Sequence, residues 1–233
     1  MAVSVVASSN NGAASGTALS VSAPTGTTTG DLVVCCVHVN SQTNTIADNN
    51  GSTPFTENVN DYKPNDAGGH TFSIFSRVIQ ASDPTTYNFT AGSSQRWSVV
   101  AATFRGFDTG TNFEITPSTT YFNNENNFDD SDVDAPTVTT SVSGSIHVAG
   151  ANMDTGATIT ITLPTDYTDL SSRNTNQTTA LCYRVITPAG TTGAKSFTLS
   201  GDTGARMGFS FVVKNAATTS VKDILGGFIP FAR

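Results

Sequence analysis

A strand-like motif occurs twice in this chain, and its surroundings recur in the same order. Phe75–Ile79 returns as Cys182–Ile186, with Arg-Val-Ile in the same place in both copies. Further along, Arg96-Trp97 opens an apolar run after the first copy, and Arg206-Met207 opens a similar run after the second. Matches in the same order indicate two copies of one β-rich unit. The repeat constrains the architecture, but it carries no chemistry.

Composition favours the same architecture. Only 12% of the residues are charged, and Ser, Thr, Asn and Gly are abundant, which suits short strands joined by turns. We therefore expect an all-β fold, an antiparallel jelly-roll-like β-sandwich built from two pseudo-symmetric halves. Residues 1–220 should form the sandwich, with repeat halves at about 30–107 and 144–214 joined by a long surface connection at 108–143.

The alternation of apolar and polar residues predicts where the strands lie. Phe72 and Phe75 fall on opposite faces of one expected strand, so this strand should be covered on both sides. Leu32–Val37 is a continuous apolar run, as expected for the middle of a sandwich. The expected strands are 2–7, 17–22, 31–39, 70–80, 85–90, 95–105, 137–142, 145–151, 157–163, 178–186, 194–200 and 206–214.

The three cysteines are expected to be buried, unpaired apolar residues. Cys35 and Cys36 are adjacent in a strand, so their side chains should point to opposite faces. Cys182 takes the place of Phe75 in the repeat. An odd number of cysteines argues against a disulfide framework.

The net charge of −7, with only four lysines, argues against two classes of partner. Proteins that bind nucleic acid neutralise phosphates with clustered Lys and Arg, and anionic membranes attract the same residues. We expect neither nucleic acid nor membrane as a partner. The N-terminal residues lack the basic and long apolar segments of a secretory signal, so we expect a soluble protein made in the host cytoplasm.

The sequence offers little for catalysis, and we expect no enzymatic activity, no catalytic residues and no cofactor. The histidines His38, His70 and His147 are scattered, without the paired spacing of a zinc site. Two distant carboxylates can in principle form a glycosidase site, which leaves open Asp31 with Glu57 or Glu114. Solvated surface positions explain Asp31 and Glu57 more simply.

Two other clusters deserve a functional interpretation beside a structural one. The acidic residues Asp129, Asp130, Asp132 and Asp134 are a weak calcium candidate, because alternate carboxylates in a bent loop supply hard oxygen ligands; a solvated acidic loop is the favoured interpretation. Exposed aromatic rings can stack on sugars, which makes Tyr62 and Tyr121 candidate glycan-binding residues. Trp97 aligns with Met207 and is expected in the core.

Several segments together resemble a known group of proteins. The segments are Gly30–Val34, Thr53–Thr56, Phe75–Ile79, Tyr87–Thr90 and Val100–Phe107. Their order is similar to that in duplicated β-sandwich structural proteins of tailed bacteriophages and prophages. The resemblance implies an accessory virion protein, one that decorates or cements the capsid. It also implies a location in the virion, the major capsid protein or other virion subunits as partners, and a homo-oligomer.

The last stretch, 221–233, lies outside the repeat and is unusually apolar. It can pack on the chain's own sandwich or dock on a neighbouring subunit, where each Å² of buried apolar surface contributes roughly 25 cal/mol before ordering costs. The expected partner-docking residues are Ile224, Leu225, Phe228, Ile229 and Phe231. The alternative function is a carbohydrate-binding module, or a receptor-binding component of a tail or fibre.

Overall fold

The computed structural model describes residues 2–63, 69–125, 132–154, 158–175, 177–200 and 206–216. Within these ranges the chain forms antiparallel strands and one short 3-10 turn, η1 (Thr119–Tyr121). The predicted all-β fold is confirmed. The docking residues expected in 221–233 lie outside the described residues.

The N-terminal half contains a large and a small sheet. The large sheet has five strands in the order β1-β8-β3-β6-β5, and the small sheet has three in the order β2-β7-β4. The strands are β1 (Ser4–Ala13), β2 (Ala18–Ser22), β3 (Leu32–Val39), β4 (Ile46–Asp48), β5 (Thr56–Tyr62), β6 (Thr71–Val78), β7 (Thr86–Ala91) and β8 (Trp97–Arg105).

The C-terminal half is built in the same way. Its large sheet runs β10-β17-β12-β15-β14, with the short β9 also paired to β17, and its small sheet runs β11-β16-β13. The strands are β9 (Phe113–Ile115), β10 (Phe122–Glu125), β11 (Asp132–Ala135), β12 (Ser145–Met153), β13 (Ile161–Thr162), β14 (Thr168–Thr175), β15 (Gln177–Ile186), β16 (Lys195–Leu199) and β17 (Arg206–Val213).

The two halves share one strand order. When β1 to β8 are matched in sequence with β10 to β17, both the large and the small sheets have corresponding neighbours. The ladders agree in detail at the repeated arginines, because Arg77 lies opposite Val33 and Arg184 lies opposite His147. Descent of both halves from one ancestral unit stays a prediction.

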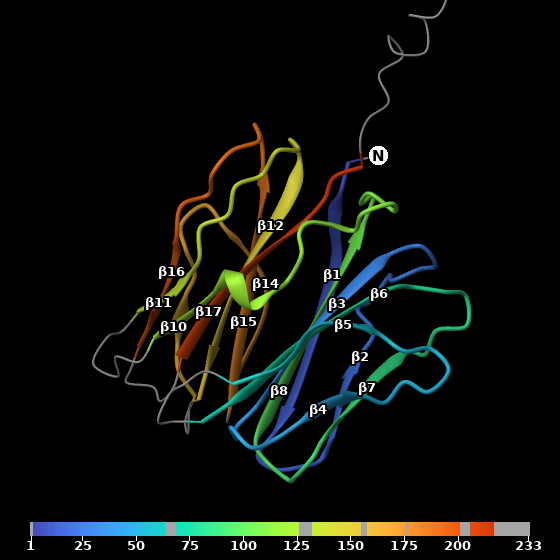
Figure 1. Cartoon of the computed structure of the whole chain (residues 1–233), viewed down its shortest axis with the longest axis vertical. Coiled ribbons are helices and arrows are strands. Elements are labelled where there is room, and N and C mark those ends of the chain that lie inside the picture. The colour runs from blue at the N-terminus through green and yellow to red at the C-terminus, as the bar shows by residue number, and fades with distance from the viewer. Residues whose placement is uncertain are drawn as a thin grey trace, which may run out of the picture.

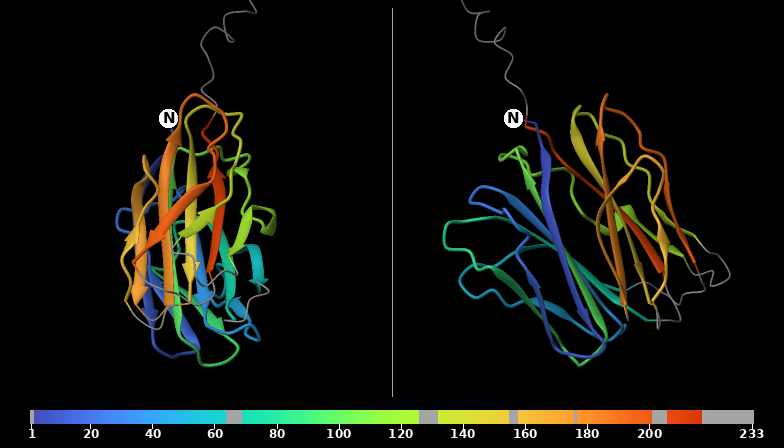
Figure 2. Two further views of the ribbon diagram at one scale, coloured as in Figure 1. Left: turned by 90° about the vertical axis from the view of Figure 1, so that its left-hand side faces the viewer. Right: turned by 180° about the vertical axis from the view of Figure 1, so that it is seen from behind.

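The sheets stack in four layers around three apolar clusters (Figures 1 and 2). The two large sheets face each other in the middle and enclose the central core, with Leu32, Phe72, Val148 and Phe209 among its members. Each small sheet covers the outer face of its own large sheet, enclosing an N-terminal outer core and a C-terminal outer core. The large sheets are therefore apolar on both faces.

Strand β3 shows how the sequence specifies this arrangement. All eight of its residues are buried. Leu32, Val34 and Cys36 point into the central core, whereas Val33 and Cys35 point into the N-terminal outer core. The period of two places alternate residues on opposite faces, so a strand between two cores must be apolar throughout. The predicted central strand and the opposite orientations of Cys35 and Cys36 are confirmed.

The connection expected at 108–143 contains more structure than its sequence suggested. It includes β9, η1, β10 and β11, and β10 and β11 are edge strands of the two C-terminal sheets. The strand expected at 137–142 is wrong: this segment has a single bridge, between Thr139 and Thr191. The Asn- and Asp-rich sequence conceals β10 because it has no apolar alternation, and it conceals β11 because the alternation there spans only four residues; pairing to β17 and β16 defines both strands.

The expected correspondence of Trp97 with Met207 is also wrong by one residue. Trp97 pairs with Val39, and Arg206, not Met207, pairs with the matching residue Met153. A shift of one residue exchanges the faces of a strand. Trp97 is accordingly buried in the N-terminal outer core, as expected of a core residue, whereas Met207 lies in the central core.

Candidate functional site

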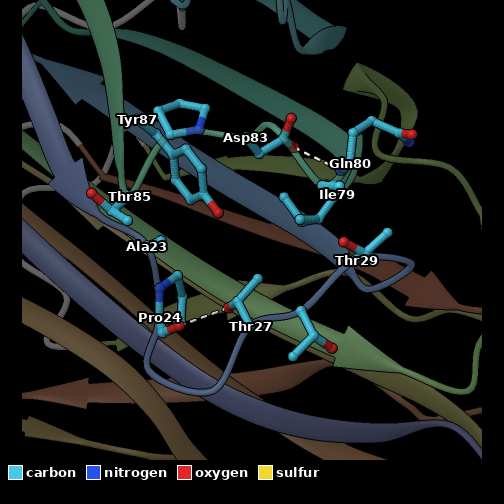
Figure 3. Close-up of a pocket in the computed structure, with 12 residues that line it drawn as sticks. Ala23, Pro24, Thr27, Thr29, Ile79, Gln80, Asp83, Thr85 and Tyr87 are labelled. Carbon is cyan, nitrogen blue, oxygen red and sulfur yellow. Dashed lines mark hydrogen bonds between the residues drawn. The ribbon is translucent and has the colours of Figure 1, made fainter.

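A pocket of about 460 Å³ lies at one end of the N-terminal half. Its walls come from the β2–β3 connection and the β6–β7 connection, which the hydrogen bond from Ala23 N to Thr85 O (2.9 Å) holds together (Figure 3). Its volume is in the range of small-molecule sites, roughly 300–1,000 Å³. The lining combines the apolar side chains of Ala23, Pro24, Ile79, Ala81 and Pro84 with the polar side chains of Thr27, Thr28, Thr29, Gln80, Asp83, Thr85 and Tyr87.

The threonines of the first wall are fixed by the structure behind them. The Thr27 hydroxyl donates to Pro24 O (2.7 Å) and lies 2.8 Å from the Thr103 hydroxyl. Thr28 N donates to Asp31 Oδ2 (2.8 Å), and Arg105 binds both oxygens of the same carboxylate at 2.7 Å. Burial alone would raise the pKa of Asp31, but the hydrogen bonds from Arg105 and Thr28 outweigh it and lower the pKa. This wall is therefore rigid.

The second wall is set by a buried ion pair. Arg77 donates to Asp83 Oδ1 and to Thr53 O, and Gln80 N donates to Asp83 Oδ2 (3.0 Å). The side chains of Arg77 and Asp83 are only 9% and 4% exposed. The Arg77 guanidinium also lies over the Phe55 ring, 5.9 Å from its centroid. The Asp83 carboxylate is thus neutralised before any ligand arrives.

Tyr87 forms the floor of the pocket. The residue is 1% exposed, and its ring packs edge-to-face on Phe55 with centroids 5.2 Å apart. Figure 3 shows its hydroxyl pointing into the space between the two connections. Burial raises the pKa of Tyr87, with the nearby Cys35 and Asp83 acting in the same direction, so the phenol stays neutral. A neutral phenol can both donate and accept a hydrogen bond.

The tyrosines expected to bind glycans lie elsewhere. Tyr62 is half-buried at the end of β5, and its ring packs edge-to-face on Phe122 at 4.7 Å, against the central core. Tyr121 ends η1, directly before Phe122. Neither residue lines the pocket of the N-terminal half.

The acidic candidates are only partly described. Asp129 and Asp130 lie outside the described residues, whereas Asp132 and Asp134 lie in β11. They alternate with Val133 and Ala135, which point into the C-terminal outer core, so the two carboxylates share the opposite face. Among the described residues, no three His, Cys, Asp or Glu side chains are arranged to hold a metal ion.

The carboxylates left open for a glycosidase have separate tasks. Glu114 accepts hydrogen bonds from Ser141 and Val142 of one loop and from Ser145 Oγ (3.0 Å). Burial would raise the pKa of Glu114, but these bonds outweigh it and lower the pKa. The pKa of Glu57 is raised, first by burial and then by Asp61 and Asp48. Asp31 is 2% exposed and is held by Arg105, so the solvated surface position expected for it is wrong. Asp31 and Glu114 thus each stabilise a different loop.

The three histidines are buried and neutral. His38 and His70 meet edge-to-face with ring centroids 4.8 Å apart, and His38 Nδ1 lies 3.2 Å from Thr178 O of the other half. Burial lowers the pKa of His70 to about 4 and holds that of His38 well below its usual range. His147 Nδ1 lies 2.5 Å from the Tyr167 hydroxyl. Burial and, to a lesser extent, Lys195 lower the pKa of His147 to about 3.

Comparison with known proteins adds no name to this site. Searches of protein-family models, of curated proteins and of solved structures find no match to the chain. Within the described ranges, no helix is long and apolar enough to cross a membrane.

Proposed function

We propose that this protein is an accessory structural protein of a tailed-phage virion that decorates or cements the capsid without catalysis. Its order of sequence motifs, from Gly30–Val34 to Val100–Phe107, supports the phage assignment by resemblance. The apolar stretch 221–233 is the proposed docking arm, with the major capsid protein or another virion subunit as its partner.

One observation carries this proposal: charged side chains in several loops form ion pairs that stabilise those loops. Asp31 is bound by Arg105, Asp83 by Arg77, and Lys214 Nζ lies 2.9 Å from Asp108 Oδ2. A surface that is ordered before binding loses little conformational entropy when it meets a partner. Repeated over a symmetric shell, modest contacts of this kind add through multivalency.

The proposal is tested by counting copies of the protein in purified virions with quantitative mass spectrometry. Hundreds of copies per particle are expected of a shell protein. A handful of copies would place the protein in a tail or fibre and contradict capsid decoration. Its absence from virions would contradict the proposal as a whole.

A second measurement addresses the docking arm. The full chain and a variant with Ile224, Leu225, Phe228, Ile229 and Phe231 all changed to Ser are added to particles that lack the protein. The Ser variant should lose occupancy, because it removes the apolar surface available for burial. Lys222→Ala, in the same segment, is the matched control and should bind as the full chain does. Full occupancy by the Ser variant would show that the arm is not the docking element.

A further inference from the structure

The Tyr87 hydroxyl points into the pocket and has no hydrogen-bond partner among the described residues. Its residue is 1% exposed, and no residue that the structure describes donates to or accepts from its oxygen. The hydroxyl oxygen itself is not sealed off: it opens onto about 460 Å³ of space. A polar group in this position is paired by solvent or by a ligand, so the hydroxyl is available for ligand binding.

The rest of the lining has no unpaired charge to offer. Asp83 is bound by Arg77 and by Gln80 N, and Asp31 behind the threonine wall is bound by Arg105. What remains are neutral groups, namely the hydroxyls of Thr29, Thr85 and Tyr87 and the side-chain amide of Gln80. Pro24, Pro84 and Ile79 supply apolar surface beside them. A matching ligand is neutral, rich in hydroxyls and apolar on one face.

We propose that this pocket binds a neutral saccharide, with the Tyr87 hydroxyl at its floor as the anchoring hydrogen-bond partner. A sugar ring presents hydroxyls at its edge and C–H groups on its face, which suits threonine and tyrosine hydroxyls beside proline rings. The inference concerns residues 23–29 and 79–87 and does not depend on the location of the protein in a virion.

The backbone of the walls argues against an extended peptide as the ligand. Such peptides gain affinity mainly from main-chain hydrogen bonds to an open edge. Here several of the main-chain donors are used internally: Ala23 N bonds Thr85 O, Thr27 N bonds Pro24 O, and Asp83 N bonds Gln80 O. Side-chain hydroxyls therefore supply much of what a ligand meets, which favours a sugar.

The pocket is also prepared for binding. Arg77 and Arg105 fix its two walls from behind, and Phe55 fixes the Tyr87 ring. Rigid side chains lose little entropy when a ligand is bound, so a small neutral ligand can bind with few contacts.

The test is a titration of the full chain with neutral saccharides, followed by amide shifts in two-dimensional NMR. The probes are methyl α-mannoside, maltose, cellobiose, lactose and N,N′-diacetylchitobiose, each up to roughly 10 mM, which detects dissociation constants in the millimolar range. We expect saturable shifts at 23–29 and 79–87 for at least one probe. No saturable shift with any of them would overturn the proposal.

Two variants place the binding in the pocket. Tyr87→Phe removes only the hydroxyl and should weaken binding by about three- to tenfold, the loss of one hydrogen bond. Tyr62→Phe is the matched control and should bind unchanged, because Tyr62 lies outside the pocket. Ala81→Trp, on an exposed part of the rim, should abolish binding by filling the cavity.

Other outcomes are decisive against the proposal. Equal affinity for the wild type, Tyr87→Phe and Ala81→Trp would place the sugar elsewhere on the molecule. Binding of a proline-rich peptide or of 3′-sialyllactose to the pocket, without any neutral probe, would show that the ligand class is wrong.

Discussion

The two outer cores have the same strand order around them but are filled with different side chains. The N-terminal outer core is rich in aromatic residues: Phe55, Phe75, Tyr87, Phe89 and Trp97. The C-terminal outer core has alanines on β11, β12 and β15, with one phenylalanine, Phe197. One sheet topology therefore accommodates two packing solutions.

Matched positions on the ladders show how volume is redistributed. In the N-terminal half Cys36 pairs with Val100, and at the corresponding place in the C-terminal half Gly150 pairs with Phe209. The Phe209 ring occupies the space that a side chain at Gly150 would need, since an added Cβ would lie 2.1 Å from Phe209 Cζ. A large residue and glycine thus replace two medium-sized residues, as volume-conserving cores tolerate.

The same comparison applies to the pocket floor. Tyr87 pairs with Val21 of β2, and the matching pair in the C-terminal half is Lys195 with Ala135 of β11. The Lys195 ammonium lies over the Tyr167 ring at 5.6 Å, so this position holds a cation–π contact rather than a buried phenol. The candidate site therefore belongs to the half whose outer core is aromatic.

The largest loss of stability is expected when Gly208 is replaced. This residue matches Val99 of the N-terminal half. A Cβ at Gly208 would lie 2.0 Å from Asp134 O, because β11 passes directly over it. Gly208→Val should lower the free energy of unfolding by more than about 3 kcal/mol, measured by urea denaturation. Gly190→Ala, where nothing lies within 4 Å, is the control and should change stability by less than about 0.5 kcal/mol. A tolerated valine would show that β11 does not pass as closely over Gly208 as the structure has it.

The repeated arginines, Arg77 and Arg184, should contribute unequally to the free energy of unfolding. Arg77 and Asp83 are buried as a pair, whereas Arg184 and Asp166 are 44% and 78% exposed at 3.9 Å. Arg77→Ala leaves a buried carboxylate unpaired and should cost about 3 kcal/mol, but Arg184→Ala should cost less than about 1 kcal/mol. Urea midpoints of both variants measure the difference. Equal losses would mean that burial does not distinguish the two pairs.

The smallest effect on stability is that of His147, and it is expected only at acidic pH. The pKa of His147 is about 3 in the folded protein and about 6.5 in an unfolded chain, so the unfolded state binds the proton first as pH falls. Its contribution to stability is complete above pH 6.5 and is lost progressively towards pH 3. His147→Val, which installs the residue at the matching position Val33, should remove this part of the acid sensitivity.

The size of this effect follows from linkage. Between pH 6 and pH 4 the wild type should lose about 2 to 3 kcal/mol more unfolding free energy than His147→Val, by urea denaturation at each pH. Tyr167→Phe keeps the buried imidazole and should therefore keep the wild-type pH dependence. Identical pH profiles for His147→Val and the wild type would contradict the assignment of a depressed pKa to His147.

Sequence patterns predicted the central strands well, because their residues are specified from both faces. Phe72 and Phe75 lie in different cores, as their alternation indicates, and β3 is buried throughout. The edge strands β10 and β11 were missed because each has only four residues, and β10 has no apolar alternation. The one-residue error at Trp97 arose because two apolar runs can be aligned in either register, and only the ladder to β3 decides.

The pocket could not be predicted for a related reason. Its walls, 23–29 and 79–87, are distant in the chain and read individually as polar turns. What joins them is the pairing of β2 with β7 and the hydrogen bond from Ala23 N to Thr85 O. In the sequence, Tyr87 looks like any other aromatic residue of a strand. No neighbouring residue indicates that its hydroxyl faces a cavity.

The central core has a consequence for synthesis of the chain on the ribosome. Its two walls come from β3, β6 and β8 and from β12, β15 and β17, so the first wall is complete long before the second emerges. At ordinary elongation rates the interval is on the order of ten seconds. During that time the nascent N-terminal half exposes the apolar face of its large sheet. Only the C-terminal half, which is still being synthesised, can cover that face.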